Sequence, residues 1–297
     1  MSIAQAPSFA ERRAALRSAL AARRFVSAPG VFDLISARIA DAMGFAALYM
    51  TGYGTVASHL GLPDAGLATY SDMVGRVAQI CRITATPLIA DADTGYGGLL
   101  NVQHTVRGYE EAGAAAVQIE DQEFPKKCGH TPGRRVIATA DMVRKIKVAV
   151  EARRDPNLLI IARTDARTSL GLDEALARGK AYEAAGADVL FIESPESEAE
   201  MARIGSSFAR PVLANMVDGG RTPVLSRDKL QALGYAVAIF PGTGFLAAGA
   251  ALAGVYRTIR DTGSSAGVSA PLYDFMEFSK LMGFEAVWDF DKAHAED

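Results

Sequence analysis

The sequence predicts an α/β protein: one (β/α)8 barrel of the TIM type, followed by a C-terminal helical arm. Eight short apolar, strand-like runs alternate with Ala-rich segments of helical period. Several helical segments end in a glycine tripeptide such as Ala112-Gly113-Ala114, which leads directly into the next run. The length of 297 residues also allows one large domain, because such barrels commonly span about 250 residues. We therefore expect a barrel over residues 1–260 and an arm over residues 261–297.

The expected strands are apolar on both faces, which is typical of a parallel sheet covered on both sides. They lie at residues 25–28, 47–50, 87–90, 116–119, 158–162, 189–192, 211–214 and 236–240. The helices between them are expected at residues 32–43, 70–83, 101–112, 139–153, 173–185, 198–207 and 226–233. An open doubly wound sheet is the alternative. The first run is not followed by a G-x-G-x-x-G motif, which favours the closed barrel.

More than 50 residues follow the eighth run. They comprise a helical segment at 246–259, a Gly/Ser hinge at 262–267 and a second helical segment at 273–281. A flexible hinge before an amphipathic helix predicts an arm that is exchanged between subunits. A tail packed on its own barrel is the alternative, and the sequence leaves it open.

Composition and charge exclude several classes of partner. With 49% hydrophobic residues and a net charge of −3, the chain can build a large core but has no basic stripe for nucleic acid. No apolar run approaches the roughly 20 residues of a membrane helix, so we expect no membrane partner. Cys81 and Cys128 are too few for a disulfide framework, and the first residues lack an apolar stretch of signal-peptide length. These features predict a cytoplasmic protein.

Acidic residues follow several of the expected strands, where a barrel of this type carries its active site. Asp91 and Asp93 are two residues apart and share one face of a strand. Glu120 follows the fourth strand and Glu193 the sixth, and so many carboxylates in one cavity require a cation or shared protons. Carboxylates with few imidazoles favour Mg²⁺, with Mn²⁺ as an alternative. A solvated pair at a Gly-rich turn is the other interpretation of Asp91 and Asp93.

The loop after the fourth strand brings together groups that can neutralise a carboxylate and move a proton. It contains Lys126, Lys127, Cys128 and His130. For Cys128, a small buried hydrophobic residue is the alternative. Arg163 is suited to bidentate binding of a substrate carboxylate, and the alternative is a buried salt bridge with Asp165. We therefore expect a small carboxylate as the ligand.

Two motifs carry a family resemblance. The run Lys126-Lys127-Cys128-Gly129-His130, preceded by Asp91-Ala92-Asp93-Thr94-Gly95-Tyr96-Gly97, resembles the isocitrate lyase / phosphoenolpyruvate mutase superfamily. The loop is most similar to the methylisocitrate lyase and 2,3-dimethylmalate lyase branches. The resemblance implies Mg²⁺-dependent cleavage of a carbon–carbon bond in a 2-hydroxy di- or tricarboxylate of the 2-methylisocitrate or 2,3-dimethylmalate type. The products would be an α-keto acid such as pyruvate and a dicarboxylate or carboxylate. An oxaloacetate hydrolase or decarboxylase, or a phosphonomutase, of the same superfamily is the alternative, and Cys128 argues against most of these.

The resemblance also implies roles for the metal-binding and catalytic residues. Asp93 would be the direct metal ligand, while Asp91, Glu120 and Glu193 would hold the waters of the metal. Cys128 would protonate the carbanion that leaves, and Lys127 and His130 would tune its pKa. Tyr49 is a candidate base for the hydroxyl proton, and a core aromatic residue is the alternative interpretation.

Substrate binding and assembly are implied in the same way. The substrate carboxylate would be bound by Thr51, Gly52, Tyr53, Gly129, Arg163 and Asn215. Many relatives have a serine and small residues near Thr51, so Tyr53 is expected to reshape the pocket. Asp64 would act through a water or Lys127, with a plain turn cap as the alternative. The expected assembly is a homotetramer.

Overall fold

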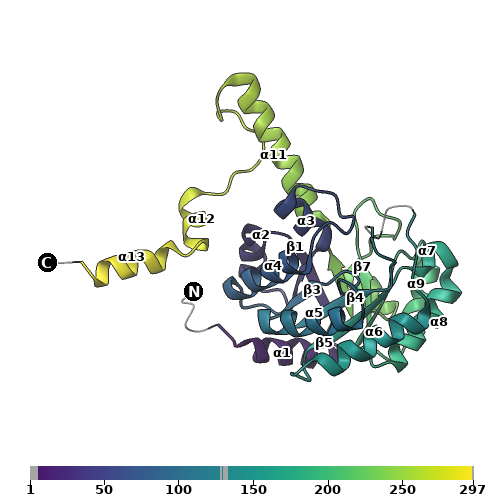
Figure 1. Cartoon of the computed structure of the whole chain (residues 1–297). Helices are drawn as coiled ribbons and strands as arrows, with labels where there is room; N and C mark the ends of the chain where they lie inside the picture. Colours follow the sequence, from purple (N-terminus) through teal and green to yellow (C-terminus); the bar gives the residue numbers. More distant parts are fainter. Residues whose placement is uncertain (1–5, 128, 130–132, 296–297) are drawn as a thin grey trace.

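The eight strands form a closed barrel in a computed structural model that describes residues 6–127, 129 and 133–295 (Figure 1). Two residues with predicted roles, Cys128 and His130, lie outside the described residues. The strands follow chain order around the barrel, and β1 closes it by pairing in parallel with β8. The predicted (β/α)8 fold is therefore confirmed, and each strand lies within about two residues of its predicted position, apart from longer C-terminal ends on β1 and β5.

The strands are short and almost entirely buried, as expected for a parallel barrel. Their bounds are β1 Val26–Val31, β2 Leu48–Met50, β3 Leu88–Asp91, β4 Ala116–Glu120, β5 Leu159–Thr164, β6 Val189–Ile192, β7 Val212–Asn215 and β8 Val237–Phe240.

Helices surround the barrel, and three of those near it were not predicted from the sequence. The first ten are α1 Phe9–Ala21, α2 Leu34–Ala42, α3 Gly52–Leu60, α4 Tyr70–Ile83, α5 Leu99–Ala112, α6 Thr139–Ala152, α7 Ala166–Leu170, α8 Leu172–Ala184, α9 Glu198–Gly205 and α10 Arg227–Ala232. The unpredicted ones are α1, α3 and α7. α3 follows β2 after a single residue, Thr51, so no separate loop marks its start in the sequence.

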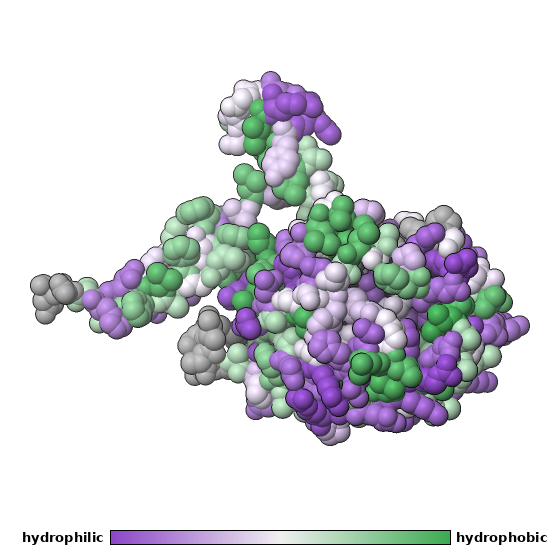
Figure 2. All heavy atoms as spheres, viewed as in Figure 1, coloured by the Kyte–Doolittle hydropathy of each residue, from purple (hydrophilic) through white to green (hydrophobic). Residues whose placement is uncertain are grey.

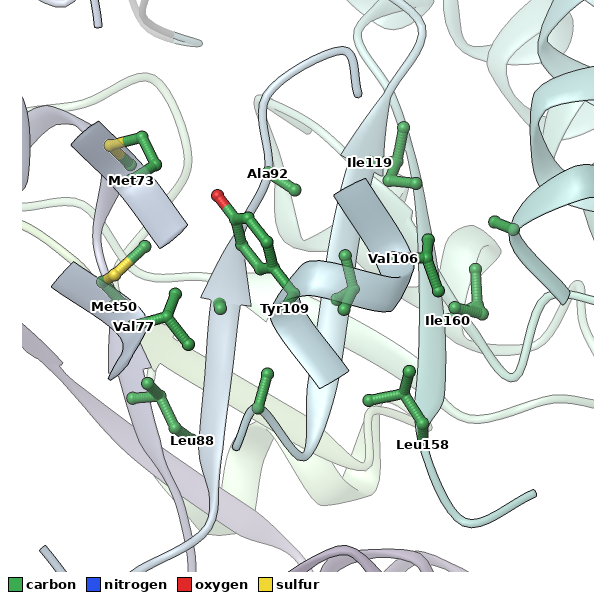
Figure 3. Packing of buried hydrophobic residues seen from close by; sticks show 14 of the residues in the cluster. Met50, Met73, Val77, Leu88, Ala92, Val106, Tyr109, Ile119, Leu158 and Ile160 are labelled. Carbon is green, nitrogen blue, oxygen red and sulfur yellow. The ribbon is translucent and has the colours of Figure 1, made fainter. Parts of the chain in front are cut away.

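Alternation along each strand separates two apolar layers. On β3, Leu88 and Ala90 face the helices, whereas Ile89 belongs to the cluster inside the barrel. Figure 3 shows the outer layer, in which Met73, Val77 and Tyr109 pack against β2 to β5. The inner cluster includes Leu16 and Leu20 of α1, which therefore covers the amino-terminal end of the barrel. At the other end the inward positions become charged, since Asp91 follows Ile89 on the same side of β3.

The C-terminal arm leaves the barrel. The predicted arm, residues 261–297, contains α12 Phe275–Leu281 and α13 Phe284–Ala293, and α11 Thr243–Thr262 precedes it. Figure 1 shows all three helices extending away from the strands, and from here on we call the three together the arm. No residue within these three helices is buried. Many of their side chains are apolar, as the green atoms on the arm in Figure 2 show. Among the described helices, none combines the length and the apolar character needed to cross a membrane.

Candidate active site

A cavity of about 290 Å³ opens at the carboxyl ends of the strands. Twelve residues with predicted roles line it: Tyr49, Thr51, Gly52, Tyr53, Asp64, Asp91, Glu120, Lys127, Gly129, Arg163, Glu193 and Asn215. They come from β2 to β7 and from the connections that follow these strands. This convergence is the geometry that the barrel fold produces, because all eight parallel strands end on the same side. We call this end of the barrel the mouth.

The carboxylates of the mouth are buried and close to one another. Burial raises the pKa of Asp93 to about 7, and the ammonium of Lys126 only partly opposes this increase. Burial also raises the pKa of Asp91, and it raises the pKa of Glu120 well above its ordinary value despite the nearby Arg163. Asp91 Oδ1 accepts a hydrogen bond from the backbone N–H of Asp93 at 3.0 Å, which ties the two acids together. Among the residues that line the cavity, the acids Asp64, Asp91, Glu120, Glu193 and Asp218 also outnumber the cations Lys126, Lys127 and Arg163.

Lys126 is the central cation of this cluster, and its role was not predicted. Its Nζ lies 2.5 Å from Asp64 Oδ1 and 2.7 Å from Asp93 Oδ1. Asp93 does not line the cavity itself, whereas Lys126 does. Asp64 is predicted to act through a water or Lys127; in this structure its ion pair is with Lys126, whereas the Nζ of Lys127 lies 3.5 Å from the carbonyl oxygen of Gly133. The sequence could not decide between two adjacent lysines, which point in different directions.

Arg163 forms the buried salt bridge with Asp165 that was the alternative to a substrate-binding role. Its Nε and Nη2 donate to the two carboxylate oxygens of Asp165, each at 2.9 Å. Arg163 also lies 3.3 Å from Glu120 and 3.2 Å from Glu193. Its Nη1 donates no hydrogen bond to any of the described residues, and the side chain lines the cavity. One terminal nitrogen of Arg163 is therefore available for a ligand even though the fork is engaged.

Tyr49 faces the cavity from β2. Its hydroxyl group donates a hydrogen bond to Gln118 Oε1 at 3.3 Å. Burial, and next the charge of Asp91, raise the pKa of Tyr49 well above 10, so the phenol is protonated near neutral pH. A role as base therefore requires a factor that lowers this pKa, such as a nearby divalent cation.

The amino terminus of α3 faces the same cavity. Thr51 is its N-cap residue, and the backbone N–H groups of a first helical turn have no partner within the helix. Such a terminus favours an anion. Gly52 is required for the close approach of Asp91, since a Cβ atom at position 52 would lie 2.4 Å from Asp91 Oδ2. This backbone and Asp91 thus form one wall of the cavity.

The loop after β4 reaches the cavity at Lys127 and Gly129, which flank Cys128 in the sequence. A Cβ atom at position 129 would lie 2.3 Å from Arg163 Nη2, so only glycine allows this contact. The carbonyl oxygen of Gly129 accepts a hydrogen bond from Ser194 Oγ at 3.1 Å. The predicted roles of Cys128 and His130 concern residues outside the described part and stay predictions.

The remaining wall is apolar. The sequence predicts Tyr53 in this wall but does not predict Phe245 and Leu246. Tyr53 is 43% exposed, and its ring packs against Phe245 with the centroids 5.3 Å apart. Phe245 and Leu246 belong to the first turn of α11 and line the cavity with the loop at Val217 and Asp218. On the polar side, Asn215 Nδ2 donates to Glu193 Oε2 at 3.0 Å. The first turn of the arm helix thus contributes to the site.

The donors of the mouth fit a hydrated hard cation. Within the described ranges, no group of three His, Cys, Asp or Glu residues is arranged to enclose a metal ion. Mg²⁺ needs no such cage, because it keeps several waters and takes one or two protein carboxylates. Glu120 Oε1 is buried and has no hydrogen-bond partner among the described residues. A carboxylate oxygen in that state is a suitable acceptor for a metal-bound water.

Fold and site together define a TIM-barrel enzyme with an acidic mouth for a small anionic ligand. The model of the phosphoenolpyruvate phosphomutase family matches residues 16–260, and the chain belongs to this family, the PEP mutase/isocitrate lyase superfamily. The chain is 48% identical to 2,3-dimethylmalate lyase of Eubacterium barkeri over 95% of its length and 98% of the relative. It is 43% identical to 2-methylisocitrate lyase of Aeropyrum pernix over 95% of its length and 89% of the relative.

Solved structures give the same fold. A structure of oxaloacetate acetylhydrolase with 3,3-difluorooxalacetate has a TM-score of 0.91 and 34% identity over 96% of this chain and 97% of that one. A crystal structure of 2,3-dimethylmalate lyase has a TM-score of 0.89 and 37% identity over 97% of this chain and 95% of that one. Phosphonopyruvate hydrolase, solved with oxalate and Mg²⁺, has a TM-score of 0.86 and 30% identity over 96% of this chain and 99% of that one.

Proposed function

We propose that the protein is a magnesium-dependent carbon–carbon lyase that cleaves a 2-hydroxy di- or tricarboxylate of the 2-methylisocitrate or 2,3-dimethylmalate type. The observation that carries the proposal is the convergence of buried carboxylates, Arg163 and the amino terminus of α3 on one cavity. The names of the two lyase relatives, at 48% and 43% identity, support this reaction class. A cytoplasmic location is part of the proposal and agrees with the buried free thiol of Cys81.

Asp93, Asp91 and Glu120, with Glu193 nearby, would hold the magnesium ion and its waters. The ion supplies positive charge that stabilises negative charge on the 2-hydroxyl oxygen and on the keto acid. Arg163 Nη1 and the N–H groups at Gly52 and Tyr53 bind and orient the carboxylates of the substrate. Tyr53 and Phe245 offer an apolar surface to its alkyl substituent.

The bond changes follow from this orientation. Tyr49, as the phenolate that a nearby divalent cation would favour, takes the proton of the 2-hydroxyl group, and the O–H electron pair forms the carbonyl of the α-keto acid. The carbon–carbon bond breaks, and its electron pair stays on the carbon of the second product. Cys128 then donates a proton to that carbon, which completes the dicarboxylate or carboxylate. Lys127 and His130 support the thiol in this proposal.

The test is an assay of keto-acid release from 2-methylisocitrate, isocitrate, 2,3-dimethylmalate and oxaloacetate, with Mg²⁺ and with EDTA. We expect metal-dependent release from one of the first three acids and its loss in Cys128→Ala. Cys81→Ala is the matched control, because Cys81 is buried in α4 away from the cavity and should leave activity unchanged. Turnover that does not respond to Mg²⁺ would refute the metal assignment.

A second candidate is hydrolysis or decarboxylation of oxaloacetate, and the likeness to oxaloacetate acetylhydrolase favours it. The same assay separates the two candidates. If Cys128→Ala still turns over oxaloacetate at the rate of the unmodified enzyme, while no 2-hydroxy acid is cleaved, this second function is the correct one.

We further propose that the arm is exchanged between subunits of a homotetramer. The support is the apolar surface of the arm: Tyr256, Phe275 and Phe290 are all exposed, and α11 to α13 bury no residue. An apolar surface of this kind favours a protein–protein contact. Light scattering after size-exclusion chromatography should give four subunits for the full chain and fewer after truncation at Thr262. A full-length monomer would refute the proposal.

A further inference from the structure

A second cavity lies at the opposite end of the barrel from the mouth. Its volume is about 570 Å³, and its lining includes Arg17, Arg23, Phe25, Asp188, Arg210 and Tyr235. We call it the floor cavity. It lies between the end of α1 and the residues that begin or precede β1, β5, β6, β7 and β8. None of its lining residues belongs to the cavity at the mouth.

The charge of the floor cavity is positive. Arg23 and Arg210 are exposed, and their guanidinium groups form no ion pair or hydrogen bond with any described residue. Asp188 is the one carboxylate among the lining residues, and it is already neutralised by Arg17 at 3.0 Å and Arg153 at 2.5 Å. Two guanidinium groups are therefore left for an anion, and the planar fork of arginine suits a carboxylate or phosphate.

Two buried donors in the same cavity lack partners. Tyr235 is only 4% exposed, and its hydroxyl group has no hydrogen-bond partner among the described residues. Arg17 Nε is likewise buried and unpartnered within the described part of the chain. Buried polar groups without a partner are uncommon and costly, so each calls for an explanation. Both residues line the floor cavity, which makes a ligand bound there the candidate partner for these groups.

The backbone conformation of Arg23 is a second, independent observation that indicates a role in binding. α1 ends at Ala21 with Ala22 as its C-cap, and the next residue, Arg23, has a positive φ of 54°. Glycine is the usual residue at this position because it alone adopts the left-handed conformation without strain. Arginine is therefore strained here, and its side chain lines the floor cavity. Strain of this kind is typical of functional sites.

We propose that the floor cavity binds a small organic anion of two or more charges, which Arg23, Arg210 and Tyr235 hold and whose apolar part packs on Phe25 and Phe208. The shared chemistry is that of phosphate and carboxylate groups. This ligand is separate from the substrate, since strands of four to six residues separate the floor from the mouth. Leu159 in the floor cavity and Arg163 at the mouth, for example, are about 13 Å apart along β5 at 3.3 Å per residue.

The test is isothermal titration calorimetry of the full-length protein in EDTA, with pyrophosphate and citrate as the two probes. We expect saturable binding of at least one probe, and the better probe tells whether phosphate or carboxylate is preferred. Arg23→Gln/Arg210→Gln should weaken that binding about tenfold, the loss of roughly two charge-assisted contacts. Arg24→Gln/Arg82→Gln removes the same charge from exposed residues outside both cavities and should change the affinity less than about twofold.

Two single substitutions separate binding from folding. Arg23→Gly should raise the melting temperature of the ligand-free protein, because it relieves the strained φ, yet weaken binding of the probe. Tyr235→Phe should leave the melting temperature unchanged or higher and also weaken binding, since the hydroxyl group has no protein partner to lose. No saturable binding by the unmodified protein, or equal affinity in the Arg23→Gln/Arg210→Gln variant, would overturn the proposal.

Discussion

The two ends of the barrel use buried charge differently. At the mouth, Asp93 and Glu120 have raised pKa values, because burial and neighbouring acids outweigh the nearby cations. At the floor, Asp188 has two arginine partners and also accepts the backbone N–H of Ile160 at 2.9 Å. At the mouth, the carboxylates that lack enough cationic partners lie where a ligand can neutralise them. At the floor, the carboxylate with two arginine partners lies where it supports the fold. Changes at the mouth should therefore alter activity, and changes at the floor carboxylate should alter stability.

The largest expected effect is at Asp93. Asp93→Asn should lower kcat/KM for the 2-hydroxy acid about a thousandfold, roughly 4 kcal/mol, because it removes the proposed metal ligand. Its folded-state pKa of about 7 lies above the ordinary 3.8, so ionisation of Asp93 destabilises the folded state as pH rises between these values. In EDTA, the variant should therefore gain stability relative to the unmodified protein from pH 4 to pH 7. Keto-acid release measures the loss of kcat/KM, and urea unfolding at pH 4 and pH 7 measures the change in stability. If Asp93→Asn were inactive but less stable than the unmodified protein at pH 7, the comparison between the two ends would be contradicted.

Asp188→Asn tests the other end. Breaking a buried ion pair leaves Arg17 and Arg153 without their acid, so the free energy of unfolding should fall by about 3 kcal/mol. At a temperature where the variant is folded, kcat/KM should stay within about twofold. Asp173→Asn is the matched control, since its pair with Arg203 is exposed and worth less than about 1 kcal/mol. A large loss of turnover in folded Asp188→Asn would mean that the two ends are not independent.

A smaller effect is expected at Gly52. The added methyl group of Gly52→Ala would meet Asp91 Oδ2 at 2.4 Å, so the carboxylate must turn away from the amino terminus of α3. We expect kcat/KM to fall about thirtyfold, roughly 2 kcal/mol. Gly75→Ala serves as the control: it lies inside α4 with open space around it and should stabilise the protein by up to about 1 kcal/mol without affecting turnover. Equal kinetics for both variants would rule out a role for this close approach.

The smallest effect is at the apolar wall. Tyr53→Ser removes the ring that packs on Phe245 and should change the ratio of kcat/KM between 2-methylisocitrate and 2,3-dimethylmalate about tenfold, as expected for a change in apolar contact. Tyr256→Ser removes an exposed ring farther along α11 and is the control for a general effect of tyrosine loss. An unchanged ratio would place the specificity elsewhere in the cavity.

The strands were easier to predict than the site. Periodicity and glycine stops predicted all eight strands, because burial on both faces gives each strand a continuous apolar run. The acids of the mouth were also predictable, since Asp91 and Glu120 directly end their strands. The partner of Asp64 was not, because a loop conformation decides whether Lys126 or Lys127 turns inward. Phe245 and the floor cavity were missed for a similar reason: their neighbours are distant in sequence, and no local pattern marks such contacts.

The position of α11 has one more consequence. Its first turn supplies Phe245 and Leu246 to the substrate cavity, while its other end projects about 30 Å outward as one continuous rod. Because the helix is one continuous element, we expect a contact that tilts its outer end to move Phe245 and Leu246 and so to change the space for the substrate. Dilution that dissociates the subunits should therefore alter KM. An antibody fragment that binds the projecting end should do the same, although it does not contact the substrate.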